Sequence, residues 1–436
     1  MSEILTRQVK LPCGATLSNR IAKAGMSEQL ATRDGMPTDR LRRLYAVWAR
    51  GGAGLLITGN VMIDRTALVE PRNAILEDER SLPAFRAWTD AVHAAGPDRP
   101  DGPGGPGGPG GPGGPAIWMQ INHPGRVATV PLTHRPVGPS ALREPVPGFS
   151  LRRARRLSGR DIQALTARYA RTAELAVAAG FDGVQIHAAH GYLLAQFLSP
   201  LANTRDDSYG RDPAGRRRLL LDIVAATRAA VGPHVPISVK LNSTDFQHGG
   251  LSEAESLDVA RALADAGIDL LEISGGNYAE PAMEGVHHTG RAATGEAYFA
   301  RYADTVRTHI DALPLMLTGG LRTRDAMHRH VTGGIDVIGI ARPMAFVPDY
   351  PARILTGEAP PLLPRPLRTT GYRPLDGYLQ LAVHNHQFHR IATGRTPQPT
   401  ATYGTALSAL ARLGRAAATQ LTVARPAAPV HPQSCT

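Results

Sequence analysis

Three proton-bearing rings lie within six positions of one another in the segment HAAHGYLLAQFLSP. His187, His190 and Tyr192 come directly after the apolar run 181–186, which has the composition of a buried strand. Imidazole and phenol groups donate hydrogen bonds and move protons, so rings that leave one strand end together can act on one bound molecule. This spacing makes the three residues the first candidates for a catalytic site.

Other uses of these rings have to be weighed against catalysis. A single histidine at a strand end is often a surface or core-packing residue, and a buried tyrosine often only satisfies its own hydroxyl group. Paired histidines also bind zinc, but zinc takes three or four ligands, and the nearby sequence provides no cysteine and no suitably spaced carboxylate. Cys13 and Cys435 are the only cysteines, so we expect neither a metal cluster nor a disulfide framework.

Polar or glycine-rich segments follow the other apolar runs as well. Met26 stands at the first of these ends, and the polar residues there and at the other ends are Ser27, Asn60, Gln120, His123, Lys240 and Asn242. The last three runs end in ISGGNY, LTGGLRT and GIARPM. In the last two of these segments, bare backbone amides stand beside Arg322 and Arg342, which is the layout of a phosphate site.

The elements that must position these residues alternate along the chain. The strand candidates are 20–24, 54–58, 116–121, 181–186, 236–241, 269–273, 314–318 and 336–340. Helical stretches lie between them, at 39–50, 82–95, 160–179, 214–231, 252–266, 296–311 and 323–332, and Ser158 and Ser252 are start signals. The alternation predicts an α/β fold, a closed (β/α)8 TIM barrel with its chemistry at the carboxyl ends of the strands. An open doubly wound sheet is the rival, but its usual glycine fingerprint after the first strand is missing.

Three segments fall outside this alternation. Residues 8–20, QVKLPCGATLSNR, predict a small N-terminal β-hairpin that plugs the bottom of the barrel. The GGP repeats of 96–115 predict a flexible insertion on the face opposite the active site. We therefore expect a barrel domain over 1–350 and a C-terminal extension over 351–436, outside the barrel proper, partly helical and with a disordered end.

The composition is that of a globular chain. Of the 436 residues, 42% are hydrophobic and 19% are charged, and no run reaches the ~18 apolar residues that a membrane span needs. The start of the chain lacks the apolar region of a secretory signal. We expect a cytoplasmic protein that is not associated with a membrane.

The net charge of +11 raises the question of nucleic-acid binding. The excess is mostly scattered arginine, and the one dense cluster is Arg152, Arg153, Arg155 and Arg156. Because aromatic and basic residues are not interleaved, we expect no nucleic-acid partner. A second role in nucleic-acid binding through this cluster is the alternative, and it would show as a steep salt dependence of affinity.

The order of motifs resembles the Old Yellow Enzyme family of FMN-dependent ene-reductases, in its bacterial NADH:flavin oxidoreductase branch. The matching segments run from about residue 3 to 350 and are SNRIAKAGMSE, QINHPGR, GFDGVQIHAAHGYLLAQFLSPLANTRDDSYG, VKLN, ISGG, LTGG and DVIGIARPM. The long segment around His187 is close to diagnostic of the family.

The resemblance implies an FMN site. Gln120 would bond the pyrimidine edge of the flavin, and Lys240 would face its N1/O2 side, where a cation favours the reduced flavin. The remaining flavin-binding residues would be Ala24, Gly25, Met26, Ser27 and Asn60, and those at the ribityl phosphate would be Gly319, Gly320, Gly339, Ala341 and Arg342.

The resemblance also implies roles for the three rings. His187 and His190 would bind the carbonyl oxygen of an enone and stabilise the developing enolate, and Tyr192 would protonate the α-carbon. Two residues depart from the family pattern. Ser27 stands where relatives often carry Cys or Thr, and Lys240 replaces an arginine, which keeps the charge and loses a bidentate fork.

The expected activity is therefore hydride transfer from NADH or NADPH, through FMN, to the activated C=C bond of an α,β-unsaturated carbonyl compound. The longer dienoyl-CoA reductases add an iron–sulfur cluster and a nucleotide domain, for which this chain has neither the cysteines nor the length. The alternatives on the same barrel are a flavin-dependent desaturase or amine dehydrogenase and an NAD(P)H oxidase (diaphorase). The resemblance is compatible with a homo-oligomer and does not fix the number of subunits.

Overall fold

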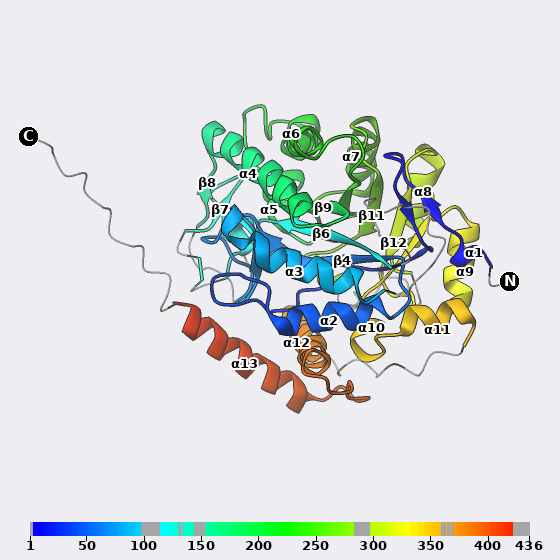
Figure 1. Ribbon diagram of the computed structural model, residues 1–436. Helices are drawn as coiled ribbons and strands as arrows, with labels where there is room; N and C mark the ends of the chain where they lie inside the picture. Colours follow the sequence, from blue (N-terminus) through cyan, green and yellow to red (C-terminus); the bar gives the residue numbers. More distant parts are fainter. Residues whose placement is uncertain are drawn as a thin grey trace, which may run out of the picture.

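Eight parallel strands form a closed barrel in the computed structural model, which describes residues 3–96, 114–129, 132–133, 135–143, 153–282, 297–358, 363, 367 and 370–421 (Figure 1). The barrel strands are β3 (Ile21–Lys23), β4 (Leu55–Met62), β6 (Ala116–Asn122), β9 (Gly183–Ala188), β10 (Ile237–Asn242), β11 (Leu270–Ser274), β12 (Leu315–Thr318) and β13 (Val337–Ile340). The sheet closes because β3 pairs with both β4 and β13. This confirms the predicted (β/α)8 TIM barrel, and every barrel strand overlaps its predicted range.

Helices surround the barrel. The helices that follow the strands are α2 (Asp39–Ala49), α3 (Leu82–His93), α4 (Gly159–Ala178), α6 (Pro213–Val231), α7 (Glu253–Asp265), α8 (Ala300–His309), α9 (Arg324–Thr332), α10 (Pro343–Phe346) and α11 (Tyr350–Thr356). Ser158 and Ser252 cap α4 and α7 as expected, and Asp161 and Glu255 complete the two capping boxes. Among the described residues, no helix is long and apolar enough to cross a membrane.

Short elements that the sequence analysis did not predict lie in the connections. They are α1 (Glu3–Thr6), α5 (Leu193–Leu198), β5 (Ala74–Ile75), β7 (Val137–Gly138), β8 (Arg155–Arg156) and the 3-10 turns Glu79–Ser81 and Gly125–Val127.

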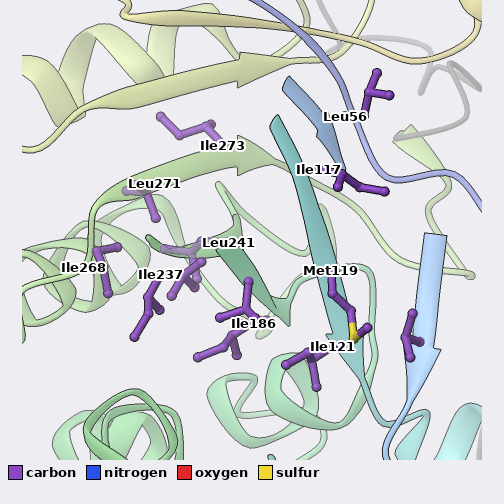
Figure 2. Packing of buried hydrophobic residues seen from close by; sticks show 14 of the residues in the cluster. Leu56, Ile117, Met119, Ile121, Ile186, Ile237, Leu241, Ile268, Leu271 and Ile273 are labelled. Carbon is purple, nitrogen blue, oxygen red and sulfur yellow. The ribbon is translucent and has the colours of Figure 1, made fainter. Parts of the chain in front are cut away.

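Alternate residues of each strand face opposite sides of the barrel wall. On β10, Ile237 and Leu241 belong to the apolar layer between strands and helices, together with Ile186 of β9 (Figure 2). Ser238 and Lys240 alternate with these outward-facing residues of β10 and therefore face the barrel interior. The same alternation turns His187 of β9 inward, because Lys240 and His187 are direct neighbours across the two strands.

An N-terminal hairpin closes the amino ends of the strands, as predicted. Strands β1 (Val9–Lys10) and β2 (Thr16–Leu17) pair antiparallel. Val9 and Leu17 pack with interior residues of the barrel, among them Trp118 and Leu270, in one apolar cluster. The hairpin leaves the opposite end of the barrel for the polar residues.

Two helices of the C-terminal extension lie against the barrel on the side of α2 (Figure 1). They are α12 (Arg373–Ala392) and α13 (Tyr403–Leu421). Phe388 of α12 meets Trp48 of α2 edge to face, with ring centroids 5.3 Å apart. The expected disordered end beyond residue 421, and the expected flexible insertion apart from Gly96, Gly114 and Pro115, lie outside the described residues.

Candidate functional site

A cavity of about 1070 Å³, which we call the main cavity, opens at the carboxyl ends of the strands. The structure brings most of the predicted site residues to its wall: Ala24, Gly25, Met26, Ser27, Asn60, Gln120, His187, His190, Tyr192, Lys240, Gly319, Ala341 and Arg342. Residues that are distant in sequence therefore share one space.

The two other predicted residues, Gly320 and Gly339, line an adjoining hollow of about 940 Å³, which we call the glycine cavity. It shares Gly319 and Arg342 with the main cavity. A Cβ atom added to Gly339 would lie 2.0 Å from the Thr318 Oγ1, so the backbone there must stay bare. The two cavities adjoin each other, and together they extend from the carboxyl end of β3 to the carboxyl ends of β12 and β13.

Positive charge converges on the glycine cavity. Arg322 and Arg342 donate hydrogen bonds of 3.2 and 3.1 Å to the same oxygen, the Tyr298 hydroxyl. Gly319 and Gly320 have φ values of +117° and +77°, a backbone conformation that glycine adopts readily. Bare backbone beside two guanidinium groups is an arrangement that fits a phosphate ester.

A buried polar network runs across the barrel interior beneath the main cavity. Lys240 Nζ lies 2.9 Å from Glu272 Oε1, and both side chains are almost fully buried. The other Glu272 oxygen accepts from Gln185 Nε2 at 2.8 Å, and Gln185 Oε1 accepts from Gln120 Nε2 at 2.7 Å. The chain of bonds fixes the orientation of Gln120 and of the Lys240 ammonium group, both of which line the cavity.

The two histidines stand on the opposite flank of the cavity, with ring centroids 5.0 Å apart. The Nδ1 atom of His187 accepts from the Ala189 amide at 3.2 Å, so the ring proton belongs on Nε2. The ring of His190 bonds the Ser274 hydroxyl at 2.8 Å through Nε2. His190 itself has a φ of +61°, and its amide donates to Asn242 Oδ1 at 3.1 Å, which holds this unusual conformation.

Both imidazoles are neutral at pH 7. Burial lowers the pKa of His187 well below its ordinary value, and the neighbouring His190 and Lys240 lower it further. Burial also lowers the pKa of His190 well below its ordinary value, again with a contribution from Lys240. Each neutral ring carries one N–H group, on Nε2 in His187 and on Nδ1 in His190 when the Ser274 hydroxyl donates to its Nε2.

Tyr192 completes this flank, with its ring centroid 4.8 Å from that of His187. Its hydroxyl accepts from Asn60 Nδ2 at 3.2 Å and lies 2.8 Å from the hydroxyl of Tyr278. Asn60 reaches this position after a break in the β4–β6 register between Ile57 and Asn60, and such irregularities re-aim side chains next to active sites. The phenol is thus held at the cavity wall by two polar partners.

The structure adds residues that the sequence analysis did not select. Glu70, Ser274, Tyr278 and Phe299 line the main cavity. So do six residues of α12, a helix that the sequence analysis placed outside the barrel: Pro374, Gly377, Tyr378, Leu381, His384 and Phe388. Tyr278 stands in the segment ISGGNY and could have been found there, whereas the pattern of α12 does not say which of its faces meets the barrel.

The other two strand-end candidates do not line the cavity. Burial lowers the pKa of His123 to about 4, and its Nδ1 accepts from the Gly125 amide at 3.0 Å. Asn242 acts on the site only by accepting the His190 amide. In the arginine cluster, Arg155 pairs with Asp161 and Arg156 with Asp206, while Arg152 lies outside the described residues.

Comparisons with known proteins agree with this architecture. Residues 112–359 match the NADH:flavin oxidoreductase / NADH oxidase family. The chain is 35% identical over 377 residues to the NADH-dependent flavin oxidoreductase iccE of Talaromyces variabilis, which covers 80% of this chain and 86% of that protein.

Two solved structures share the fold. The Old Yellow Enzyme homologue from Zymomonas mobilis has a TM-score of 0.66 at 26% identity and covers 85% of this chain and 98% of that one. Morphinone reductase has a TM-score of 0.66 at 25% identity and covers 85% of this chain and 95% of that one. The chain therefore belongs to the NADH:flavin oxidoreductase / NADH oxidase family, the family of the Old Yellow Enzyme, and is an oxidoreductase that uses FMN and NAD(P)H.

Proposed function

We propose that this enzyme reduces the activated C=C bond of α,β-unsaturated carbonyl compounds. The observation that carries the proposal is the meeting of two neutral histidines and a tyrosine on one flank of the cavity whose other walls fit a flavin. When bound, FMN supplies the chemistry of taking a hydride from NAD(P)H and passing it to a substrate carbon.

The residues that would hold FMN are those that line the two joined cavities. Gln120, which is oriented by Gln185, would hold the polar edge of the ring, and Lys240 would supply a positive charge to it. The bare backbone of the glycine cavity and its two arginines suit the phosphate end. The other residues that would hold FMN are Ala24, Gly25, Met26, Ser27, Asn60, Gly319, Gly320, Gly339, Ala341 and Arg342.

His187 and His190 would bind the carbonyl oxygen of the substrate. Two N–H donors aimed at one oxygen stabilise the negative charge that grows there as the C=C bond is attacked. Because both rings are neutral, they donate these bonds without needing a proton from solvent. Their contribution is therefore a fixed dipolar one, already in place before the substrate arrives.

Tyr192 would deliver the proton that completes the reduction. Its O–H bond breaks, a C–H bond forms at the α-carbon, and the negative charge that had grown on the carbonyl oxygen is discharged onto the phenol oxygen. Asn60 and Tyr278 can both donate to that oxygen afterwards. Tyr378 and Phe388 of α12 add aromatic side chains to the wall of the same cavity.

The substrate in this proposal is a small enone, and the setting is the cytoplasm, where the reduced pyridine dinucleotide is plentiful. Product analysis tests the reaction directly. Incubation with NADPH and cyclohexenone should give cyclohexanone, with the carbonyl group intact and one donor hydrogen at the β-carbon. Formation of the allylic alcohol, or consumption of NADPH with oxygen alone, would instead point to carbonyl reduction or to an NAD(P)H oxidase.

A further inference from the structure

A third cavity, which we call the basic cavity, has no part in the chemistry described so far. It is open to solvent, measures about 1660 Å³, and lies between the segments after β3 and β4 and the helices α12 and α13. Gln420 of α13 fixes these elements together by bonding the backbones of Arg33 and Arg72, both at 3.0 Å. Four arginines line the basic cavity, together with the uncharged ring of His389: Arg33, Arg40, Arg72 and Arg412.

The positive charges of the basic cavity outnumber its negative charges. Elsewhere on the surface arginines face carboxylates, as Arg168 faces Asp64 and Arg216 faces Glu255. Within the part of the chain that the structure describes, the four arginines of the basic cavity take part in no ion pair. Two carboxylates also line the cavity: Asp39 pairs with Arg42, and Asp34, which accepts from Thr32 at 2.5 Å, offsets part of the charge of Arg72.

Like charges are held close together in the basic cavity. Burial, then Arg412 and Arg40, lowers the pKa of His389 to about 3. Burial and the neighbouring Arg33 lower the pKa of the Arg72 guanidinium. An anion placed among these groups would relieve their repulsion, and guanidinium forks match the geometry of phosphate oxygens.

The basic cavity shares a wall with the main cavity. Ser27 and Glu70 line the main cavity. Gln29 and Pro71, which lie close to them in sequence, line the basic cavity. On α12 the consecutive residues Phe388 and His389 line the main cavity and the basic cavity, respectively. Gln29 Nε2 bonds Glu70 Oε2 across the wall at 3.0 Å.

We propose that the basic cavity binds a phosphate group of the pyridine dinucleotide while the nicotinamide ring reaches into the main cavity. The diphosphate is separated from the nicotinamide by one ribose, and the 2′-phosphate of NADPH lies beyond it. The Glu70 carboxylate on the main-cavity side repels phosphate, so the two cavities sort the two ends of the dinucleotide by charge. The inference rests on the family's use of NAD(P)H and is independent of enone reduction.

Calorimetry on the FMN-loaded enzyme tests this site without any turnover. The probes are ADP-ribose and 2′-phospho-ADP-ribose, which carry the phosphates and lack the nicotinamide. The variant Arg72→Ala/Arg412→Ala removes two charges from the cavity, and Arg160→Ala/Arg211→Ala removes two exposed charges that do not line it. We expect the cavity variant to bind the recognised probe at least tenfold more weakly and the control variant to bind like the wild type.

The two probes distinguish the two sources of phosphate. Equal binding of both, lost in the cavity variant, assigns the diphosphate, whereas binding of the 2′-phosphorylated probe alone assigns the 2′-phosphate. Absence of binding by the wild type, or an equal loss in the cavity and control variants, overturns the proposal. If the double variant loses its flavin or its melting transition, the single variant Arg412→Gln is used in its place. Unchanged binding of the probe by that variant would also overturn the proposal.

Discussion

The hydroxyl oxygens of Tyr192 and Tyr278 lie 2.8 Å apart at the wall of the main cavity. Burial, together with the nearby Tyr192 and Glu70, raises the pKa of Tyr278 well above its usual value. Tyr278 therefore keeps its proton at neutral pH and can donate to Tyr192 once Tyr192 has lost its own proton. In the proposed reaction this pair stabilises the phenolate that remains after proton transfer.

Replacing Tyr192 and Tyr278 one at a time distinguishes the proton donor from its hydrogen-bond partner. Tyr192→Phe should slow reoxidation of the enzyme by cyclohexenone by ~10²–10⁴-fold, which is the usual effect of removing a general acid. Tyr278→Phe should slow it by only about fivefold, because it removes one hydrogen bond of ~1 kcal/mol. Stopped-flow measurement of the flavin absorbance resolves both effects, and flavin reduction by NAD(P)H serves as the internal control. An effect of Tyr278→Phe as large as that of Tyr192→Phe would contradict the assignment of roles.

Removing both histidines should abolish enone turnover and leave the flavin bound. Each N–H donor to a developing oxyanion contributes ~10²–10³-fold to the rate, so His187→Ala/His190→Ala should lose essentially all activity. The FMN content should be unchanged, because the phosphate end and the Lys240 side of the cavity are intact. His234→Ala, at an exposed position away from the cavity, is the matched control. Unchanged enone turnover in the double variant would sink the role given to the histidines.

The affinity for cyclohexenone should be flat between about pH 6 and pH 8. A histidine with its ordinary pKa of ~6.5 would gain a proton as the pH falls through this range. Burial lowers the pKa of both His187 and His190, so their protonation begins only at lower pH and the neutral donors persist. Spectral titration of the oxidised holoenzyme measures this affinity. An inflection near pH 6.5 that disappears in His187→Ala would show that the ring titrates normally.

Removing the charge of Lys240 and removing that of Glu272 should shift the reduction potential of the flavin in opposite directions. Lys240→Met removes the cation and should lower the reduction potential by about 30 mV or more, which for two electrons is ~1.4 kcal/mol. Glu272→Gln removes the opposing charge and should raise the potential. Lys240→Arg keeps the charge and should stay close to the wild type. Spectroelectrochemical titration gives all three values, and a shift of the same sign for Lys240→Met and Glu272→Gln would refute this account of the pair.

Most of the barrel could be predicted from the sequence because its strands are continuous apolar runs with breakers between them. His187, His190 and Tyr192 could be selected because they stand close together directly after one such run, where a barrel strand ends. The burial of Lys23, by contrast, does not follow from the pattern of apolar residues. Its side chain is fully buried on the outer side of the wall, with its Nζ 2.7 Å from the Ile57 carbonyl oxygen and 4.7 Å from the Trp48 ring centroid.

The contribution of α12 to the cavity could not be predicted for a related reason. Its helical pattern was recognised, but packing on the barrel depends on contacts with distant residues, such as Phe388 with Trp48. The residues Tyr378 and His384 of α12 therefore entered the site only with the tertiary structure. A helix with apolar residues on more than one face does not reveal from its sequence which face covers a ligand.

An anaerobic spectral titration tests the central claim most directly. Purified protein is reduced with NADPH or NADH without oxygen, and cyclohexenone is then added while the flavin absorbance is followed. Our account predicts that the flavin band bleaches with the dinucleotide and returns in one step with the enone. A flavin that bleaches but ignores a panel of enones would contradict ene-reduction and favour the diaphorase or desaturase alternative.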